Sequence, residues 1–224
     1  MCSLAYIFPG QGSQRVGMGR ALYESSPAVR ALFQRADALL DFPLEQLCFE
    51  GPEEALTETR HAQPALLVTA LAFWEWARAQ GAPAPAFLAG HSLGHFSALA
   101  AAGALDFEDA LRLVRARAEA MQDAAARHAG GMAAVIRLAR PALEQVCQQA
   151  SAETGAYVGI ANDNSPEQLV ISGERRALER AMELAKEAGA RRVVPLAVSG
   201  AFHSPLMESA AEAFRAAAGA VPIC

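Results

Sequence analysis

Short apolar runs and longer amphipathic stretches alternate along the first 128 residues. The apolar run at residues 4–8 is ended by Pro9-Gly10, so it predicts a buried strand that leads into a glycine-rich loop. Residues 85–90 predict a second short strand. Helices are predicted by periodicity or composition at residues 27–40, 64–80, 93–102 and 106–127. Ser92 therefore stands at a strand-to-helix junction.

The pattern changes at Gly130, after which predicted strands become more frequent. Four strands and two helices follow one another in the order βαββαβ, with a turn at residues 162–167: strands at 130–138, 156–161, 168–172 and 191–198, helices at 140–150 and 174–189. This order, over about 70 residues, is typical of a self-contained ferredoxin-like domain. A last helix is predicted at residues 205–218, and no closing strand follows it.

Composition excludes several classes of protein. A chain of 224 residues with 53% apolar content has room for one large domain or two small ones. The net charge of −5 is mild and the basic residues are spread out, so no nucleic-acid partner is expected. Without a leader-like N-terminus or an apolar run of about 18 residues, we expect a cytoplasmic protein and no membrane partner. The cysteines are far apart, which predicts reduced, mostly structural thiols: Cys2, Cys48, Cys147 and Cys224.

The stretch GHSLGHFSAL, residues 90–99, carries candidate chemistry of two kinds. It begins with G-x-S-x-G, in which small neighbours let a serine nucleophile, here Ser92, occupy a sharp turn. His91 and His95 are four residues apart and would share a helix face, as metal ligands can. A zinc protease of that type has a Glu after its first histidine, whereas Ser92 stands there and no third ligand is evident. We therefore expect no metal site.

A serine nucleophile needs a base within hydrogen-bond reach. His203, in SGAFHSP, follows a predicted strand, in a loop where a functional side chain can be held at the end of a sheet. His91 and His95 are too close in sequence for their rings to be placed freely against Ser92, and the remaining histidines are His61 and His128. No convincing acidic third member is found, so a backbone carbonyl could orient the base, which would give a Ser92–His203 dyad.

Six motifs, spread over the whole chain, carry a family resemblance: YIFPGQGSQRVGMG, ETRHAQPALL, GHSLGHFSALAAAGALDFEDALRLVRARAEAMQ, GGMAAVI, NDNSPEQLVISG and PLAVSGAFHSPLM. In this order they resemble the malonyl-CoA:acyl carrier protein transacylases, a family of discrete fatty acid synthesis enzymes and polyketide synthase acyltransferase domains. The resemblance implies an α/β fold with a hydrolase-like large domain and its parallel sheet at residues 1–128 and 199–224. It also implies an inserted ferredoxin-like α+β small domain at residues 129–198.

The resemblance assigns roles in the reaction to four residues. Ser92 matches the nucleophile that takes the malonyl group as an ester, and His203 matches its base. Gln11 and Leu93 match the residues whose backbone N–H groups form the oxyanion hole. Removal of a single donor of that kind lowers the rate by about 100- to 1000-fold.

Three further residues are implied to contact the substrate. Arg117 matches the arginine that binds the free carboxylate of malonate, because a guanidinium fork makes two parallel hydrogen bonds that Lys cannot reproduce. Gln63, in the second motif, is implied to bind substrate as well. Phe202 matches the form associated with malonyl rather than methylmalonyl selectivity, a preference that one methyl group limits to about 1 to 3 kcal/mol.

The implied function is ping-pong transfer of malonyl from malonyl-CoA, the substrate, to the phosphopantetheine thiol of an acyl carrier protein. The carrier brings its own phosphopantetheine, so no bound cofactor and no metal are expected. Two alternatives stay open: an editing acyl hydrolase on the same fold, and a truncated, inactive module that only docks carrier proteins. The sequence leaves open whether the carrier serves fatty acid or polyketide synthesis.

Two departures from the family pattern affect these expectations. His95 stands where the family usually has Glu, which predicts altered packing or a changed site rim before lost chemistry. The family also continues beyond the His203 motif, through a strand, terminal helices and a Gln whose carbonyl orients the base. We therefore expect a large domain that is C-terminally incomplete, either truncated or completed by a partner. A motif at residue 8 favours a free-standing protein over an excised synthase domain.

A basic cluster on the predicted small domain is a candidate docking surface for the acidic carrier protein, centred on Arg191 and Arg192. Its other reading is a solvated helix face, because four glutamates are interleaved with it. The cluster consists of Arg175, Arg176, Arg180, Lys186, Arg191 and Arg192.

Overall fold

The computed structural model describes residues 4–223, which divide into two compact units. The first unit contains residues 4–119 and 214–223 of the described chain, and the second contains residues 120–213. The second unit is therefore wider than the small domain expected at 129–198, whose limits stay a prediction. No helix of the described chain is both long and apolar enough to cross a membrane.

The first unit contains the two predicted strands, β1 (Ala5–Phe8) and β2 (Phe87–Gly90), as a parallel pair. Tyr6 and Phe8, on one face of β1, pack edge-on against the ring of Trp74. On the other face Ile7 is 76% exposed and Phe87 is 66% exposed. The helical layer therefore covers one face of this parallel pair, although parallel sheets are usually covered on both faces.

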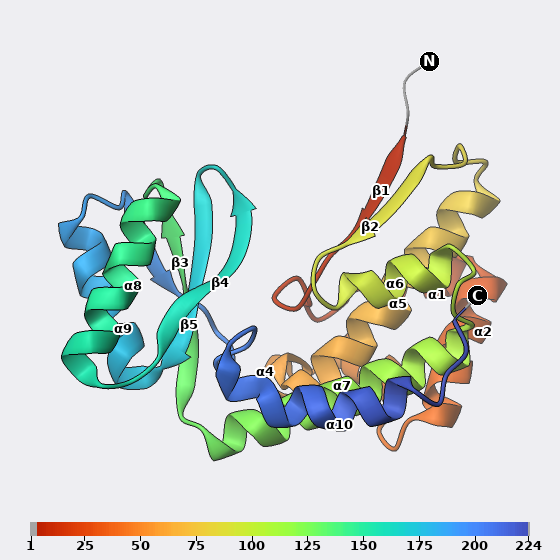
Figure 1. Cartoon of the computed structure of the whole chain (residues 1–224). Coiled ribbons are helices and arrows are strands. Elements are labelled where there is room, and N and C mark those ends of the chain that lie inside the picture. Colours follow the sequence, from red (N-terminus) through yellow and green to blue (C-terminus); the bar gives the residue numbers. More distant parts are fainter. Residues whose placement is uncertain (1–3, 224) are drawn as a thin grey trace. The chain divides into compact units, whose positions relative to one another are not determined.

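Eight helices contribute to this unit, and two of them also extend into the second unit. α5 begins five residues before its prediction, so Pro64 stands inside the second turn and not at the start that proline usually marks. Three short helices, α1, α3 and α4, were not predicted from sequence. The helices are α1 (Arg20–Ser25), α2 (Pro27–Leu39), α3 (Leu44–Glu50), α4 (Glu53–Thr57), α5 (Thr59–Ala79), α6 (Gly94–Ala101), α7 (Phe107–Arg127) and α10 (Glu208–Ala218) (Figure 1).

The second unit has the predicted order of elements: β3 (Gly130–Ile136), α8 (Arg140–Thr154), β4 (Val158–Ser165), β5 (Gln168–Glu174), α9 (Arg175–Glu187) and β6 (Arg192–Pro195). Its sheet is antiparallel, with the strand order β4-β5-β3-β6. Helices α8 and α9 pack together on one face of this sheet (Figure 1). A 3₁₀ turn, η1 (Pro205–Met207), leads from its last loop into α10.

Several predicted boundaries in this unit were wrong: β3 ends at Ile136 and not at 138, α8 ends at Thr154 and not at 150, and β4 and β6 also differ. Residues 162–165 belong to β4, and two register shifts along its pairing with β5 let the irregular sequence NDNS stay in the ladder. The turn is reduced to residues 166–167. β6 ends at Pro195, which has no N–H to donate, so the strand is shorter than the predicted 191–198.

The described cysteines are structural, as expected. Cys48 and Cys147 are free thiols buried in the helical layers of the two units. Burial raises the pKa of Cys48 to about 12 and that of Cys147 to about 11, so both thiols stay protonated near neutral pH. Cys2 and Cys224 lie outside the described residues.

Candidate functional site

Ser92 occupies a sharp turn between β2 and α6. Its backbone φ of 51° lies in the left-handed region, which is costly for a residue with a side chain. The turn is held by hydrogen bonds at both ends: His91 N–H donates to Phe8 O at 3.0 Å, and Gly94 N–H donates to His91 O at 2.9 Å. The predicted strand, turn and helix are therefore present, with the strained residue at Ser92.

The two glycines of G-x-S-x-G allow a close approach of backbone to backbone. A Cβ atom on Gly90 would overlap the backbone of Gly94, and a Cβ on Gly94 would overlap the carbonyl of Phe8. Only glycine fits at these two positions while the turn stays as tight as it is.

The loop that holds Gln11 follows β1, as the turn of Ser92 follows β2. Because the two strands are parallel and adjacent, both loops leave from the same, carboxyl edge of the pair, the edge at which open α/β sheets bind ligands. The loop is fixed internally by hydrogen bonds: Ser13 Oγ donates to Gly10 O at 2.7 Å, and Gly12 N–H donates to Gln14 Oε1 at 2.8 Å.

Arg117, on α7, brings its guanidinium to Ser92. Its Nη2 donates to Ser92 Oγ at 3.0 Å and its Nη1 donates to Gln63 Oε1 at 2.6 Å. The guanidinium carbon lies 5.9 Å from the ring centroid of Phe96, on α6. The first unit therefore places the predicted nucleophile and the predicted carboxylate-binding arginine in direct contact.

The electrostatics of Arg117 differ from those of its neighbours on α7. Arg112 pairs with Asp109 at 2.7 Å, and Arg115 pairs with Asp41 at 2.9 Å and with Glu119 at 2.8 Å. Arg117 has no carboxylate partner within the described chain, and burial lowers its pKa to about 10. It is thus still charged at neutral pH, and it is partly desolvated beside a serine hydroxyl.

A chain of side-chain hydrogen bonds continues from Arg117 to the loop after β1. Gln63 Nε2 donates to Gln11 Oε1 at 3.4 Å, and Gln11 Nε2 donates to Thr59 Oγ1 at 3.1 Å. The predicted residues Gln11, Gln63, Ser92 and Arg117 are therefore brought together, with Leu93 buried beside Ser92. Thr59 was not predicted from sequence, although its place four residues before Gln63 puts both on one helix face.

Phe202 and His203 lie in the second unit. Phe202 is buried, at 4% exposure, in a cluster that includes Met121 and Met132. His203, the next residue, is exposed and has a φ of 57°. Ser204 then donates from Oγ to Ala201 O at 2.5 Å and accepts from the N–H of Leu206 at the start of η1. A buried ring on one side and a hydrogen-bonded turn on the other thus fix the strained backbone of His203.

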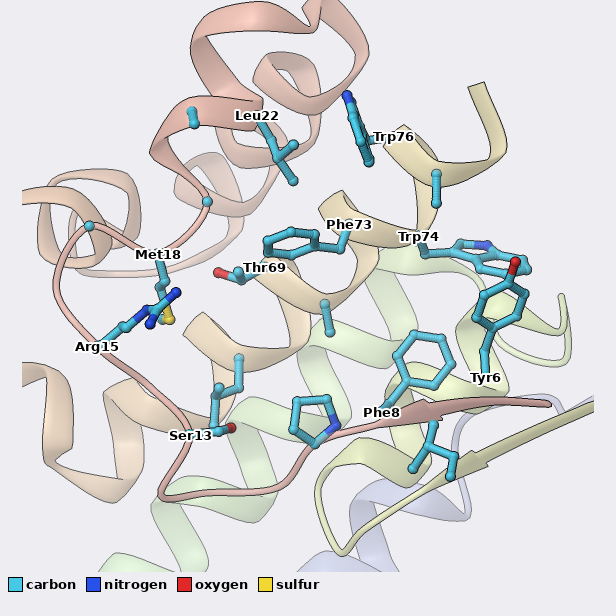
Figure 2. A pocket seen from close by; sticks show the side chains of 18 residues that line it. Tyr6, Phe8, Ser13, Arg15, Met18, Leu22, Thr69, Phe73, Trp74 and Trp76 are labelled. Atoms are coloured by element: carbon cyan, nitrogen blue, oxygen red, sulfur yellow. The ribbon is translucent and has the colours of Figure 1, made fainter. Parts of the chain in front are cut away.

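An apolar cavity of the first unit lies elsewhere. It has a volume of about 630 Å³ and is lined mainly by β1, the loop after it, α1 and α5, with Tyr6, Phe73 and Trp74 on its wall (Figure 2). None of the site residues predicted from sequence is among its lining residues. His95 is exposed on α6, so the departure from the family pattern falls on the surface of that helix.

Comparisons with known proteins agree with this geometry. Residues 5–222 match the family model described as acyl transferase domain. The chain is 51% identical over 212 residues to a malonyl CoA-acyl carrier protein transacylase of Bacillus subtilis, covering 95% of this chain and 66% of the relative. It is 45% identical to the protein of the same name from Escherichia coli K12, covering 95% and 68%. The chain thus spans about two thirds of the length of these relatives.

Solved structures give the same result. The transacylase of Coxiella burnetii superposes with a TM-score of 0.94 at 41% identity, over 99% of this chain and 69% of that one. A malonyl-transacylase in complex with a type II polyketide synthase acyl carrier protein superposes with a TM-score of 0.94 at 40% identity, over 100% and 72%. From these matches and the Ser92–Arg117 geometry, the chain belongs to the malonyl CoA-acyl carrier protein transacylase family of acyl transferase domains.

Proposed function

We propose that the protein with this chain transfers a malonyl group from malonyl-CoA to the phosphopantetheine thiol of an acyl carrier protein. The observation that carries the proposal is the contact between Arg117 and Ser92, at 3.0 Å. Malonyl has a single methylene between its thioester carbonyl and its carboxylate. A cation next to the nucleophile therefore suits an acyl group that is both short and negatively charged.

In this mechanism His203 takes the proton of Ser92 Oγ as the oxygen attacks the thioester carbonyl. The backbone N–H groups of Gln11 and Leu93 stabilise the tetrahedral oxyanion. The C–S bond then breaks, the CoA thiolate leaves with the proton from His203, and malonyl remains as an ester on Ser92. The carrier thiol attacks this ester by the same steps in reverse. The strained backbones of Ser92 and His203 support these roles, because such strain gathers at functional sites.

Selectivity for malonyl over methylmalonyl is assigned to Phe202. Its ring is buried in the second unit and so has little freedom to move away from an α-methyl group. The expected preference corresponds to about 1 to 3 kcal/mol, so it is real but leaky.

We also propose a fold family for each of the two units. We assign the first unit to a hydrolase-like α/β large domain and the second to an inserted ferredoxin-like domain with limits near 129 and 198. The parallel pair β1-β2 supports the first assignment, and the antiparallel order β4-β5-β3-β6 supports the second. The reaction needs no bound metal or cofactor of the protein's own, and we place it in the cytoplasm.

One experiment tests the reaction. The purified chain is mixed with malonyl-CoA and its intact mass is measured, followed by peptide mapping. We expect one malonyl group on Ser92, none on Ser92→Ala, and acylation slowed by about 100- to 10,000-fold in His203→Ala, the range for loss of a general base. An unmodified wild-type Ser92 would contradict the proposal and favour a module that only binds carriers.

A second step separates transferase from hydrolase. The isolated malonyl-enzyme is added to a carrier protein that has its phosphopantetheine, or to buffer alone. We expect the malonyl group to move to the carrier thiol faster than it is lost to water. Faster loss to water than to the thiol would favour the editing hydrolase.

A further inference from the structure

We propose that Thr59 is a positioning residue that connects carboxylate binding at Arg117 to the loop after β1, in which Gln11 supplies a proposed oxyanion donor. The inference rests on the proposed malonyl transfer and deepens it. Its basis is the hydrogen-bonded relay Arg117–Gln63–Gln11–Thr59, in which each group donates to the next at 2.6, 3.4 and 3.1 Å.

The direction of the relay follows from chemistry. An arginine side chain can only donate, so Gln63 must turn its carbonyl oxygen to Arg117 and its NH₂ group the other way. Gln11 therefore offers its own carbonyl oxygen to Gln63, and its NH₂ group points to the oxygen of Thr59. One charged donor thus sets the orientation of two amides, and bonds aligned in this way strengthen one another.

Burial makes the relay costly to break. Gln63 is 0% exposed and Thr59 is 1% exposed, so water cannot replace a lost partner without a change in the packing. Both residues lie on α5, one turn apart, and they hold the two ends of the Gln11 amide between them. A rigid helix therefore fixes the side chain of the residue whose backbone N–H is the proposed oxyanion donor.

The consequence is a coupling between substrate recognition and catalysis. A carboxylate bound to Arg117 changes the charge that its Nη1 presents to Gln63, and the relay carries this change to Gln11. An acyl group without a carboxylate, such as acetyl, leaves the relay in its resting arrangement. The loop at Gln11 is thus expected to favour malonyl over acetyl in the rate of ester formation, in addition to the preference that Arg117 gives in binding.

The test compares acylation of Ser92 by malonyl-CoA and by acetyl-CoA in Thr59→Val, which keeps the shape and removes the oxygen. We expect the ratio of malonyl to acetyl acylation rates to fall by about tenfold, the effect of one neutral hydrogen bond. Thr59→Ser should restore it. General loosening of the helix would slow both substrates alike and leave the ratio unchanged, a result that overturns the proposal.

Thr69→Val is the matched control. Thr69 is buried on the same helix, at 6% exposure, but lines the apolar cavity and has no part in the relay. The control should leave the malonyl to acetyl ratio at the wild-type value. Equal falls in both variants would overturn the proposal. If Thr59→Val does not fold, as judged by circular dichroism, Gln11→Met interrupts the relay while it keeps the backbone N–H of residue 11 and the bond between Gln63 and Arg117, and it is read in the same way.

A second measurement does not depend on activity. In ¹⁵N-labelled protein, the side-chain NH₂ signals of Gln11 report its bond to Thr59. We expect them to shift and to exchange faster with water in Thr59→Val, and to keep their wild-type values in Thr59→Ser. Unchanged Gln11 signals in Thr59→Val would overturn the relay, whereas absence of a malonyl ester on wild-type Ser92 counts against the proposed function alone.

Discussion

Three arginines on α7 show how local surroundings decide the role of a residue. Arg112 and Arg115 point to carboxylates, and the side chain of Arg112 is 59% exposed. Exposed pairs of that kind contribute about 0 to 1 kcal/mol. Arg117 instead meets a hydroxyl, an amide and an aromatic ring, with no carboxylate partner in the described chain. Its unmatched positive charge favours a ligand that brings a carboxylate.

Replacing Arg117 by Lys should therefore separate charge from geometry. The ammonium group keeps the charge but cannot donate to Ser92, Gln63 and a carboxylate from one planar fork. We expect malonyl acylation to fall by about 10- to 100-fold while acetyl acylation changes little, measured by intact mass under single-turnover conditions. An unchanged preference for malonyl over acetyl in the Lys variant would contradict the assignment.

The pKa of Arg117 also predicts how binding and stability depend on pH. Because burial leaves it at about 10, the guanidinium is charged throughout pH 6 to 8, and its contribution to binding should be constant there. The sign follows from the lowered pKa: the charged form is disfavoured in the folded protein. Above a pH of about 10 the folded protein binds fewer protons at Arg117 than the unfolded chain does, so the free energy of unfolding increases with pH only there. Any change in the rate of Ser92 acylation by malonyl-CoA between pH 6 and 8 must then come from another group. Such a change should therefore persist in Arg117→Lys.

At the scale of elements, the G-x-S-x-G turn joins β1, β2 and α6 at one crowded point. The glycines are required because backbone atoms, which cannot rotate aside, occupy the space of a side chain. The loops after β1 and β2 supply Gln11 and Ser92 from the same edge of the parallel pair.

Gly94→Ala should disturb this junction. The new methyl group would overlap the carbonyl of Phe8, so α6 and the turn must move away from β1. We expect a melting temperature several degrees lower, as for a loss of about 1 to 3 kcal/mol, together with loss of Ser92 acylation. Gly219→Ala is the control, since its Cβ would meet nothing closer than 3.5 Å. Equal melting temperatures for both variants would show that the junction can relax.

At the scale of the whole molecule, Ser92 belongs to the first unit and His203, its proposed base, belongs to the second. The second unit also carries the basic cluster, and the structure divides its members. Arg180 is engaged by Glu153, Glu183 and Glu187, so its charge is offset. Arg191 and Arg192, at the start of β6, are exposed and form no ion pair within the described chain. These two arginines therefore stay the proposed docking point for the carrier.

Charge reversal at Arg191 and Arg192 tests this surface. The double Glu variant should raise the KM for the carrier protein, because it places negative charge opposite an acidic partner. The rate of Ser92 acylation by malonyl-CoA should not change. Reversal of Arg78 and Arg127, exposed on helices α5 and α7, is a control with the same change in net charge. An equal rise in KM for both variants would show a general field effect and remove the specific docking site.

Much of the fold could be predicted from sequence, because the strands and long helices carry clear periodic patterns. The short helices α1, α3 and α4 could not, since five to seven residues hold too little periodicity to separate them from loops. In β4, the letters NDNS are typical of turns, but pairing with β5 outweighs that preference. Family motifs indicated Arg117, whereas local composition did not distinguish it from Arg112 and Arg115.

The sequence by itself determined the strand, turn and helix at Ser92, the order βαββαβ, and the motifs that name the family. These are local features, encoded within short windows of the chain. Only the tertiary structure showed that Arg117 meets Ser92 across 25 positions and that Thr59 completes a relay to Gln11 across 48. Such contacts depend on how helices pack against a sheet edge, and packing of this kind leaves no periodic trace in the sequence.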